Sequence, residues 1–301
     1  MTHTDGWVAH PIPYTDTPTM TALYNFGLNL PDRNANINLQ LQNNINSTNL
    51  YGQYYPDLSA GSQQNDQFSV KFQPVNALPF YWMLGKVSGT TTKTIINMDG
   101  LARKPRIATF SQVDSKKWHN YANVFGSLSL EFNESFLQCS LIGKGLSHGS
   151  NSLSPTFSYP SSVSSTYNNI TVCTWSSTSL SPYRLKMDLQ QNLQGFIGSD
   201  GFYQEISEFA PIIGTYNMQF LSDDGEALVS DFENQEKRSF VWKIVKPTDP
   251  TKYLQFTADC MIKSLLPARI HGQETVWSAV MLMEDISVES VDGLLDSFYG
   301  L

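Results

Sequence analysis

The segment Gly145-Leu146-Ser147-His148-Gly149 matches the G-x-S-x-G pattern of a nucleophile elbow. In that motif the serine sits on a sharp turn between a strand and a helix of a parallel sheet. A strand-like run does precede Ser147, but the residues that follow, NSLSPTFSYPSS, are rich in serine and proline and cannot form a helix. The chain also lacks the alternation of strands and helices that builds a parallel sheet. We therefore expect a glycine-rich turn here, with no catalytic residue and no enzyme activity.

Residue types that bind metals are present but are not spaced to do so. The segment Asp223-Asp224-Gly225-Glu226 lacks the alternating Asp/Asn ladder of a calcium loop. There is no phosphate-binding loop and no G-x-G-x-x-G segment. The histidines are scattered, with no pair at metal-binding spacing: His3, His10, His119, His148 and His271. The sequence therefore predicts no metal ion and no cofactor.

Cysteine and tryptophan residues also have a structural interpretation. The cysteines lie far apart, with no C-x-x-C spacing, and we interpret them as small buried apolar side chains: Cys139, Cys173 and Cys260. Three tryptophans could form a platform on which a sugar stacks, but their apolar surroundings favour the core: Trp82, Trp118 and Trp175.

Composition excludes several classes of protein. Charged residues make up 15% of the 301 residues, against roughly 25% in an average soluble protein, so serine, threonine, asparagine and glutamine must supply the polar surface. A net charge of −8 argues against tight nucleic-acid binding, which needs clustered lysine and arginine. Lightly charged surfaces suit proteins that bury much of themselves against partners.

The sequence shows neither the pattern of a signal peptide nor that of a membrane-spanning segment. The first residues, MTHTDGWVAHPIPYTD, lack the basic patch and apolar core of a signal peptide. No run of about twenty apolar residues occurs, so we expect no membrane insertion.

The elements that position these residues are mostly strands. Leu128–Phe132 and Leu137–Leu141 alternate apolar and polar residues around a short polar turn, which predicts an antiparallel hairpin. Similar patterns predict further strands at 37–41, 68–72, 94–96, 106–110, 183–189, 240–244, 253–260 and 277–286.

Helical segments are short. Apolar residues crowd within 74–85, which predicts a buried helix with Pro79 in its first turn and Gly85 at its C-terminal cap. Asp223 and Glu226 form a candidate capping box that would start a second helix running to Phe232. Helical spacing of apolar residues in 288–298 predicts a C-terminal docking tail.

A serine-rich stretch with two prolines divides the chain and is typical of a linker. The same order of strand, short helix and hairpin pair recurs on both sides of it, which suggests a tandem duplication of one β-sandwich. The predicted segments are an N-terminal arm (1–24), a first β lobe (25–150), a Ser-rich linker (151–167), a second β lobe (168–286) and a C-terminal tail (287–301).

The order of these elements resembles the major tail tube proteins of long-tailed, non-contractile bacterial and archaeal viruses. Three segments carry the resemblance, which covers about residues 65–285: FSVKFQPVNALPFYWMLGKVSG, RIATFSQVDSKKWHNYANVFGSLSLEF and LKMDLQQNLQGFIGSDG. Leu84-Gly85 matches the end of the family's short helix, Asn192-Leu193 the Asn-x-Leu end of a strand, and Glu226–Phe232 the helix before the last strands. The Asn-rich segment before Tyr51 and the long Ser-rich linker depart from the family pattern.

The resemblance implies a mainly β fold, with two tandem tail-tube-type β-sandwich or half-barrel lobes that each carry a short helix. It also implies a structural virion protein of the viral tail, made in the host cytoplasm. Rings of such subunits stack into a tube for genome delivery; two lobes per chain imply a trimer with pseudo-sixfold symmetry, and one lobe implies a hexamer. The implied partners are other copies, the tape-measure protein and viral DNA in the lumen, bound non-specifically, and tail terminator and baseplate proteins.

Exposed aromatic and apolar residues outside the predicted strands are candidates for contacts between subunits or rings. They lie in the N-terminal arm, a polar loop and the C-terminal tail: Trp7, Tyr51, Tyr54, Tyr55, Leu294, Leu295 and Phe298. The alternative for all three segments is that they are mobile surface.

Other functions remain open at this point. A β-sandwich surface binding module, such as a lectin or adhesin, would need an exposed aromatic platform. A tail terminator or baseplate hub could be built on the same fold as a tube subunit. A serine esterase would act through Ser147.

Overall fold

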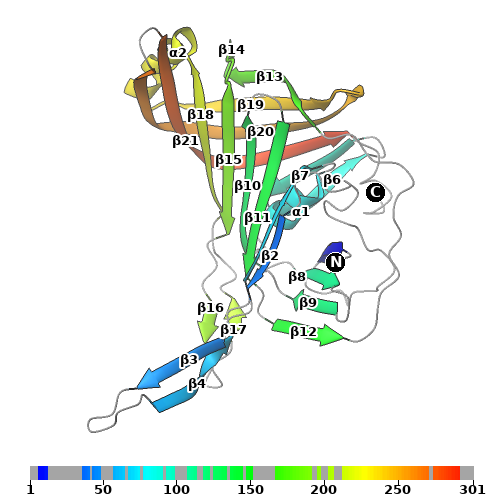
Figure 1. Cartoon of the computed structure of the whole chain (residues 1–301). Helices are drawn as coiled ribbons and strands as arrows, with labels where there is room; N and C mark the ends of the chain where they lie inside the picture. Colours follow the sequence, from blue (N-terminus) through cyan, green and yellow to red (C-terminus); the bar gives the residue numbers. More distant parts are fainter. Residues whose placement is uncertain are drawn as a thin grey trace.

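The computed structural model describes residues 6–12, 36–40, 43–48, 57–64, 67–74, 77–90, 93–98, 107–113, 118–122, 125–133, 136–144, 147–151, 167–191, 195–197, 203–206, 212–270 and 274–291. Within these ranges the chain forms antiparallel strands and two short helices, so the prediction of a mainly β fold is confirmed (Figure 1).

The largest sheet contains 13 of the described strands. Its strands, in spatial order, are β14 (Thr178–Ser179), β13 (Asn169–Trp175), β19 (Lys237–Lys246), β20 (Asp249–Ile270), β21 (Glu274–Val291), β18 (Ile212–Leu221), β15 (Arg184–Gln191), β10 (Phe125–Asn133), β11 (Phe136–Lys144), β5 (Gln67–Phe72) and β2 (Asn36–Gln40). A side branch is formed by β7 (Lys93–Met98), which pairs with β21 and with β6 (Gly85–Thr90).

Three smaller sheets complete the described fold. The first contains β1 (Gly6–Ile12), β8 (Ile107–Val113), β9 (Trp118–Ala122) and β12 (Ser147–Asn151). The others are the pairs β3 (Asn43–Thr48) with β4 (Asp57–Gln64), and β16 (Gly195–Ile197) with β17 (Tyr203–Ile206).

The hairpin predicted from alternation is present as β10 and β11. Leu128 lies opposite Leu141, and Leu130 lies opposite Cys139, and all four side chains are buried. The residues between them are partly exposed, because successive side chains of a strand point to opposite faces. The strands predicted at the other positions are also present.

Two β-bulges bend the long β20–β21 hairpin. Glu284 is unpaired between Asp285 and Met283, and Lys263 is unpaired between Ile262 and Ser264. Each extra residue shifts which side chains face inward, and bulges increase the local bend of a strand. Figure 1 shows the result: β13, β19, β20 and β21 cross over β10, β15 and β18 rather than continuing in one plane.

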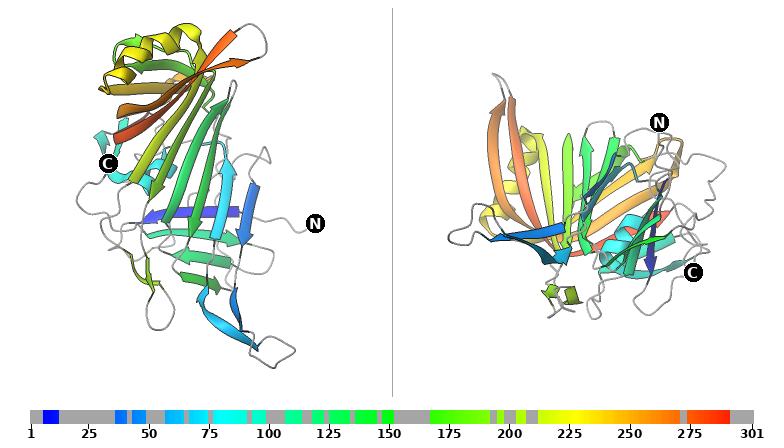
Figure 2. Two further views of the ribbon diagram at one scale, coloured as in Figure 1. Left: turned by 90° about the vertical axis from the view of Figure 1, so that its left-hand side faces the viewer. Right: turned by 60° about the horizontal axis from the view of Figure 1, so that its bottom comes forward.

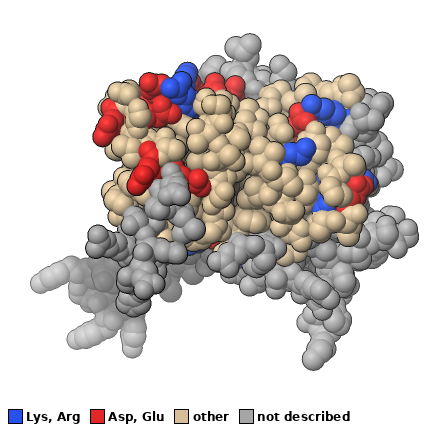
Figure 3. Space-filling view, turned by 90° about the horizontal axis from the view of Figure 1, so that it is seen from above, with Lys and Arg blue, Asp and Glu red and all other residues tan. Residues whose placement is uncertain are grey.

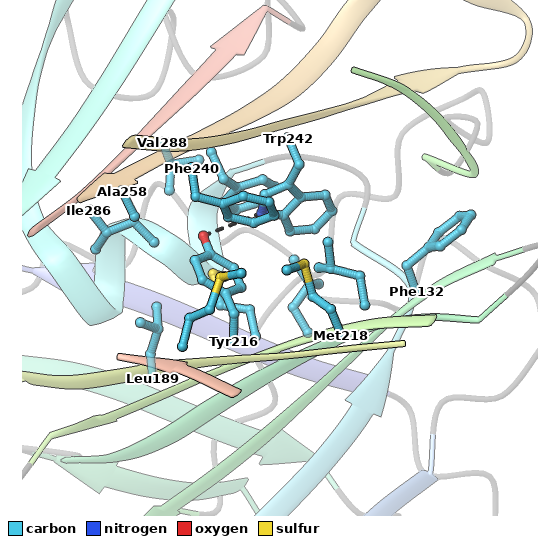
Figure 4. Close-up of a cluster of buried hydrophobic side chains, with 14 of the residues drawn as sticks. Phe132, Leu189, Tyr216, Met218, Phe240, Trp242, Ala258, Ile286 and Val288 are labelled. Atoms are coloured by element: carbon cyan, nitrogen blue, oxygen red, sulfur yellow. Dashed lines mark hydrogen bonds between the residues drawn. The ribbon is translucent and has the colours of Figure 1, made fainter. Parts of the chain in front are cut away.

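The core lies between these two layers of the bent sheet. Trp242 and Phe256 stack with ring centroids 4.3 Å apart, and the ring of Phe240 meets that of Tyr216 edge-on at 4.9 Å. The indole nitrogen of Trp242 donates a hydrogen bond of 3.3 Å to the Tyr216 hydroxyl (Figure 4). Figure 4 also shows Met218 projecting from the lower layer toward Trp242. This arrangement is a sandwich formed by one continuous sheet.

Helix α1 (Leu78–Leu84) confirms the prediction for this segment. Pro79 is its second residue, where the missing N–H costs nothing, and β6 begins directly afterwards at Gly85. Phe80 and Met83 are buried, and Phe80 packs edge-on against Phe256 with centroids 5.1 Å apart.

Helix α2 (Ser222–Glu233) is also present, but the predicted capping box is wrong. The helix begins at Ser222, so Asp223 lies inside its first turn. The carboxylate of Asp224 accepts a hydrogen bond of 2.6 Å from the backbone N–H of Ser181, which follows β14. Ser181, which is 43 residues away in the sequence, therefore contacts the first turn of α2.

Three features of the structure cross the predicted segment boundaries. Helical spacing wrongly placed Val288 in a helix: β21 continues to Val291, pairs with β20 and β7, and buries Val288. Tyr167, the last residue of the predicted linker, is fully buried. Strands of both predicted lobes share one sheet, since Ser127–Asn133 of β10 pairs with Arg184–Gln190 of β15.

Candidate functional site: a polar sheet face

The outward side of five neighbouring strands forms the candidate site, which we call the polar face. The strands β18, β15, β10, β11 and β5 lie side by side (Figure 2). Their inward residues, such as Leu130, Met187 and Tyr216, are buried in the core, so the alternate residues are the ones that reach solvent. The polar face consists of Ser69, Lys71, Ser127, Ser129, Glu131, Gln138, Ser140, Arg184, Lys186, Asp188, Gln190, Thr215, Asn217 and Gln219.

Strand register arranges these residues in rows that cross the sheet. One row runs Thr215, Asp188, Ser129, Ser140 and Lys71. The next is Asn217, Lys186, Glu131 and Gln138. Serine and threonine make up three of the five residues in the first row, and the second row holds two amides and two residues of opposite charge, so the surface is polar and its charges are mixed in sign.

The charged residues at the centre of the polar face balance one another. Arg184 donates to Oε1 of Glu131 through Nε at 2.9 Å and through its terminal nitrogen at 2.7 Å. The Nζ atom of Lys186 lies 2.8 Å from Oδ2 of Asp188, and Lys186 faces Glu131 across the strand pair. Two cations and two carboxylates therefore form one cluster whose formal charge is zero.

Exposed apolar side chains lie within and beside the polar face. Ile213 and Ile142 share the row of Gln190 and Ser127, and Ile142 lies between Ser127 and Ser69. Leu282 of β21 lies between Thr215 and the exposed Met261 of β20. Exposed apolar residues of this kind can pack against a neighbouring molecule.

Among the described strands, the large sheet ends in two strands that have one neighbour each. Within the described residues, β2 pairs only with β5, and β14 pairs only with β13. An edge strand is a template for pairing with another chain. The sheet therefore has an open edge at each end of its described order.

A second cluster of charge lies at the helix end of the molecule. Asp231 of α2 accepts a hydrogen bond of 2.6 Å from the indole nitrogen of Trp175 and pairs with Arg238 at 3.2 Å. Burial opposes ionisation, but the Trp175 and Arg238 hydrogen bonds and the Arg238 charge hold the pKa of Asp231 below its ordinary value. Seen from above, acidic side chains gather at the left, the side where Figure 1 draws α2, while the middle of this surface is largely uncharged (Figure 3).

Most residues predicted to make contacts between subunits lie outside the described residues: Tyr51, Tyr54, Tyr55, Leu294, Leu295 and Phe298. The backbone of Trp7 is in β1, opposite Gln112 of β8, but its side chain is outside the description. These assignments remain predictions.

The structure also bears on the candidate nucleophile and the candidate sugar platform. Ser147 begins β12 and pairs with Ala122 of the antiparallel β9, so its backbone does not form the strand-to-helix turn of an elbow. Trp175 is buried in the core and is not part of an exposed sugar platform. The side chains of Trp82 and Trp118 lie outside the described residues.

The three cysteines are buried, as predicted. Burial raises the pKa of the Cys139 thiol far above its ordinary value, and burial together with nearby carboxylates raises those of Cys173 and Cys260 to about 12. These thiols therefore stay protonated at neutral pH and are poor nucleophiles.

Neither of the described helices is long and apolar enough to cross a bilayer. Across the described residues, His, Cys, Asp and Glu side chains form no group of three that could hold a metal ion. No protein-family model matches this sequence, and no curated protein is significantly similar to it.

Sequence reasoning did not single out the charge cluster of the polar face. The segment Arg184–Asp188 shows its strand alternation plainly, and three of its outward residues are charged. The partner Glu131 comes from a strand 53 residues away, and that pairing appears only in the folded chain.

Proposed function

We propose that this chain is a structural subunit of a viral tail tube and that its polar face lines the channel. The observation that carries the proposal is the contrast between the two sides of one large antiparallel sheet. One side buries an extensive apolar core, and the other bears mostly polar side chains, with a central charge cluster that sums to zero and a few exposed apolar residues. The resemblance of the element order to tail tube proteins supports the same proposal.

A channel for DNA must remain hydrated without gripping the phosphate backbone. Serine, threonine and glutamine side chains hold water, and a surface with few unpaired cations gives phosphates little to exchange for their counterions. The net charge of −8 adds long-range repulsion of a polyanion. These properties fit a conduit through which a genome slides.

Ring formation would use the open edges of the sheet. Edge strands β2 and β14 can pair with strands of neighbouring subunits and so extend the sheet around a closed ring. Stacked rings would contain the tape-measure protein and DNA and would end at terminator and baseplate proteins. A ring could contain three or six copies, depending on whether each chain contributes two lobes or one.

Electron microscopy of the concentrated protein tests assembly. We expect end-on views of rings with a central hole, and stacked tubes in side view. Compact monomers at every concentration, with or without an initiator complex, would contradict the proposal and favour a monomeric binding module.

Cysteine labelling tests which face lines the channel. The native cysteines are buried, so a new surface cysteine would be labelled over a low background. We would compare Ser129→Cys, at the centre of the polar face, with Thr257→Cys, which is partly exposed in the middle of β20. A polymer-linked maleimide too large for the channel should label both variants as free subunits. In assembled tubes it should label only Thr257→Cys, and rapid labelling of Ser129→Cys in tubes would place the polar face outside the channel.

The C-terminal tail can be tested by truncation only if β21 is kept whole. Ending the chain after Glu284 removes Ile286 and Val288 from the core, so any loss of assembly could reflect unfolding. Ending it after Val291 preserves the strand and removes Leu294, Leu295 and Phe298. We expect this shorter truncation to fold and to lose tube formation; tubes of normal length would contradict the contact role of the tail.

A further inference from the structure

Each cation in the central cluster of the polar face has a carboxylate beside it. Both donating nitrogens of Arg184 point to a single oxygen of Glu131, at 2.9 and 2.7 Å. Lys186 lies 2.8 Å from Asp188 and faces Glu131 across the strands. All four side chains are only partly exposed, so the carboxylates limit the directions from which another anion could approach the cations.

Without their carboxylates, the same two cations would form an anion-binding site. Arginine offers a planar fork of donors that matches a phosphate, and lysine supplies a point charge. Neighbouring hydroxyl and amide groups, such as those of Ser129, Gln138 and Thr215, could add hydrogen bonds. Affinity for nucleic acid then rises with each phosphate that a cation neutralises.

We propose that Glu131 and Asp188 prevent the polar face from binding the phosphate backbone of double-stranded DNA. This inference rests on the proposed function, in which the genome moves past this face. The two carboxylates occupy the donors of Arg184 and Lys186 and cancel their charge. At this cluster a passing duplex therefore meets no free pair of cations that could hold a phosphate.

The test measures binding of a short fluorescent DNA duplex to unassembled protein by anisotropy at low salt. We would compare the wild type with Glu131→Gln, Asp188→Asn and the double variant. The double variant should bind about tenfold more tightly than the wild type, because two charge-assisted contacts to phosphate become available. Its binding should weaken with salt with a log–log slope that is steeper by about 2, as expected for two additional phosphates neutralised.

A matched control separates this site from a general change in charge. Glu289→Gln also removes one negative charge and frees Lys93 of β7, whose Nζ lies 2.6 Å from Oε2 of Glu289, while the amide oxygen can still accept the Tyr253 hydroxyl. It should leave DNA binding close to the wild-type level. A second control, Glu131→Gln combined with Arg184→Gln, should lose the affinity gained by Glu131→Gln alone. Unchanged thermal unfolding would show that the variants are folded.

Several outcomes would overturn the inference. These are tight binding by the wild type, no gain in the double variant, or an equal gain in Glu289→Gln. Electron microscopy of the same variants, concentrated so that rings can assemble, distinguishes this failure from failure of the proposed function. Rings without a binding gain would reject only the role of the carboxylates, whereas a binding gain without rings would reject only the tube.

Discussion

Two arginine–carboxylate pairs in this molecule share their chemistry but differ in their surroundings. Arg184 and Glu131 lie on the polar face, where their side chains are 47% and 30% exposed. Arg238 and Asp231 lie beside α2, where Asp231 is 18% exposed and also accepts the indole hydrogen of the buried Trp175. Water screens the first pair, so it contributes little to stability and mainly sets the charge of a surface. The second pair satisfies a buried donor, so it holds α2 on the sheet.

The tight packing at the α2 end should give the largest effect of mutation. A Cβ atom on Gly225 would lie 2.0 Å from Cγ of Trp277, and a rigid indole ring cannot move aside easily. Gly225→Ala should therefore lower the free energy of unfolding by about 2 kcal/mol, although alanine normally favours a helix. Urea unfolding, monitored by tryptophan fluorescence, would measure this change in the free energy of unfolding. Glu226→Ala, on the exposed side of the same turn, should change stability little; equal effects would contradict the packing argument.

The Asp231 contact should have the next largest effect. Asp231→Ala leaves the Trp175 indole nitrogen without its acceptor and removes one of the two carboxylates that pair with Arg238, the other being Glu236, which should cost about 2 kcal/mol. Asp231→Asn keeps an oxygen acceptor for Trp175, so it should cost less. Chemical denaturation of both variants would check the order. If both were as stable as the wild type, α2 would not depend on this contact.

The same contact makes a pH-dependent contribution to stability. The pKa of Asp231 is lower in the folded chain than its ordinary value of 3.8. Its contribution is therefore present above pH 3.8 and is lost as the pH falls through the lower, folded-state value. Stability measured from neutral to acid pH should fall more steeply in the wild type than in Asp231→Asn. Parallel curves would show that Asp231 is not linked to unfolding.

The polar-face pair should give the smallest effect on stability. Glu131→Gln should change the free energy of unfolding by no more than about 0.5 kcal/mol, because exposed ion pairs contribute little. Thermal unfolding of Glu131→Gln and of Asp231→Asn, measured in parallel, would compare the two ion pairs directly. A cost equal to that of Asp231→Asn would mean that the polar-face pair stabilises the fold and is not mainly a surface feature.

Local sequence patterns were sufficient for several elements. The β10–β11 hairpin was predictable because Leu128 and Leu130 alternate with polar residues, and α1 because Pro79 and Gly85 mark its ends. The tail showed the limit of such patterns. Val288 and Val291 are three residues apart, which fits a helix, but pairing with β20 and β7 keeps them in a strand.

The polar face could be predicted only in part. Alternation in β15 already put Arg184, Lys186 and Asp188 on one side of a strand, but it could not identify Glu131 as their neighbour. Trp175 and Asp231 likewise meet although 56 residues separate them. Such contacts depend on strand order, which short-range patterns do not specify.

Alternation of side chains and the scarcity of charge are properties of the chain itself, and they already imply a mainly β protein with a polar, weakly charged surface. The bend of the sheet is different in kind. Unpaired residues at Lys263 and Glu284 fold one sheet over its own core, and whether a residue is unpaired depends on the register of its partner strand. Register is a relation between distant segments, decided by which packing buries the most apolar surface while pairing the backbone. The charge balance of the polar face and the attachment of α2 both follow from that choice.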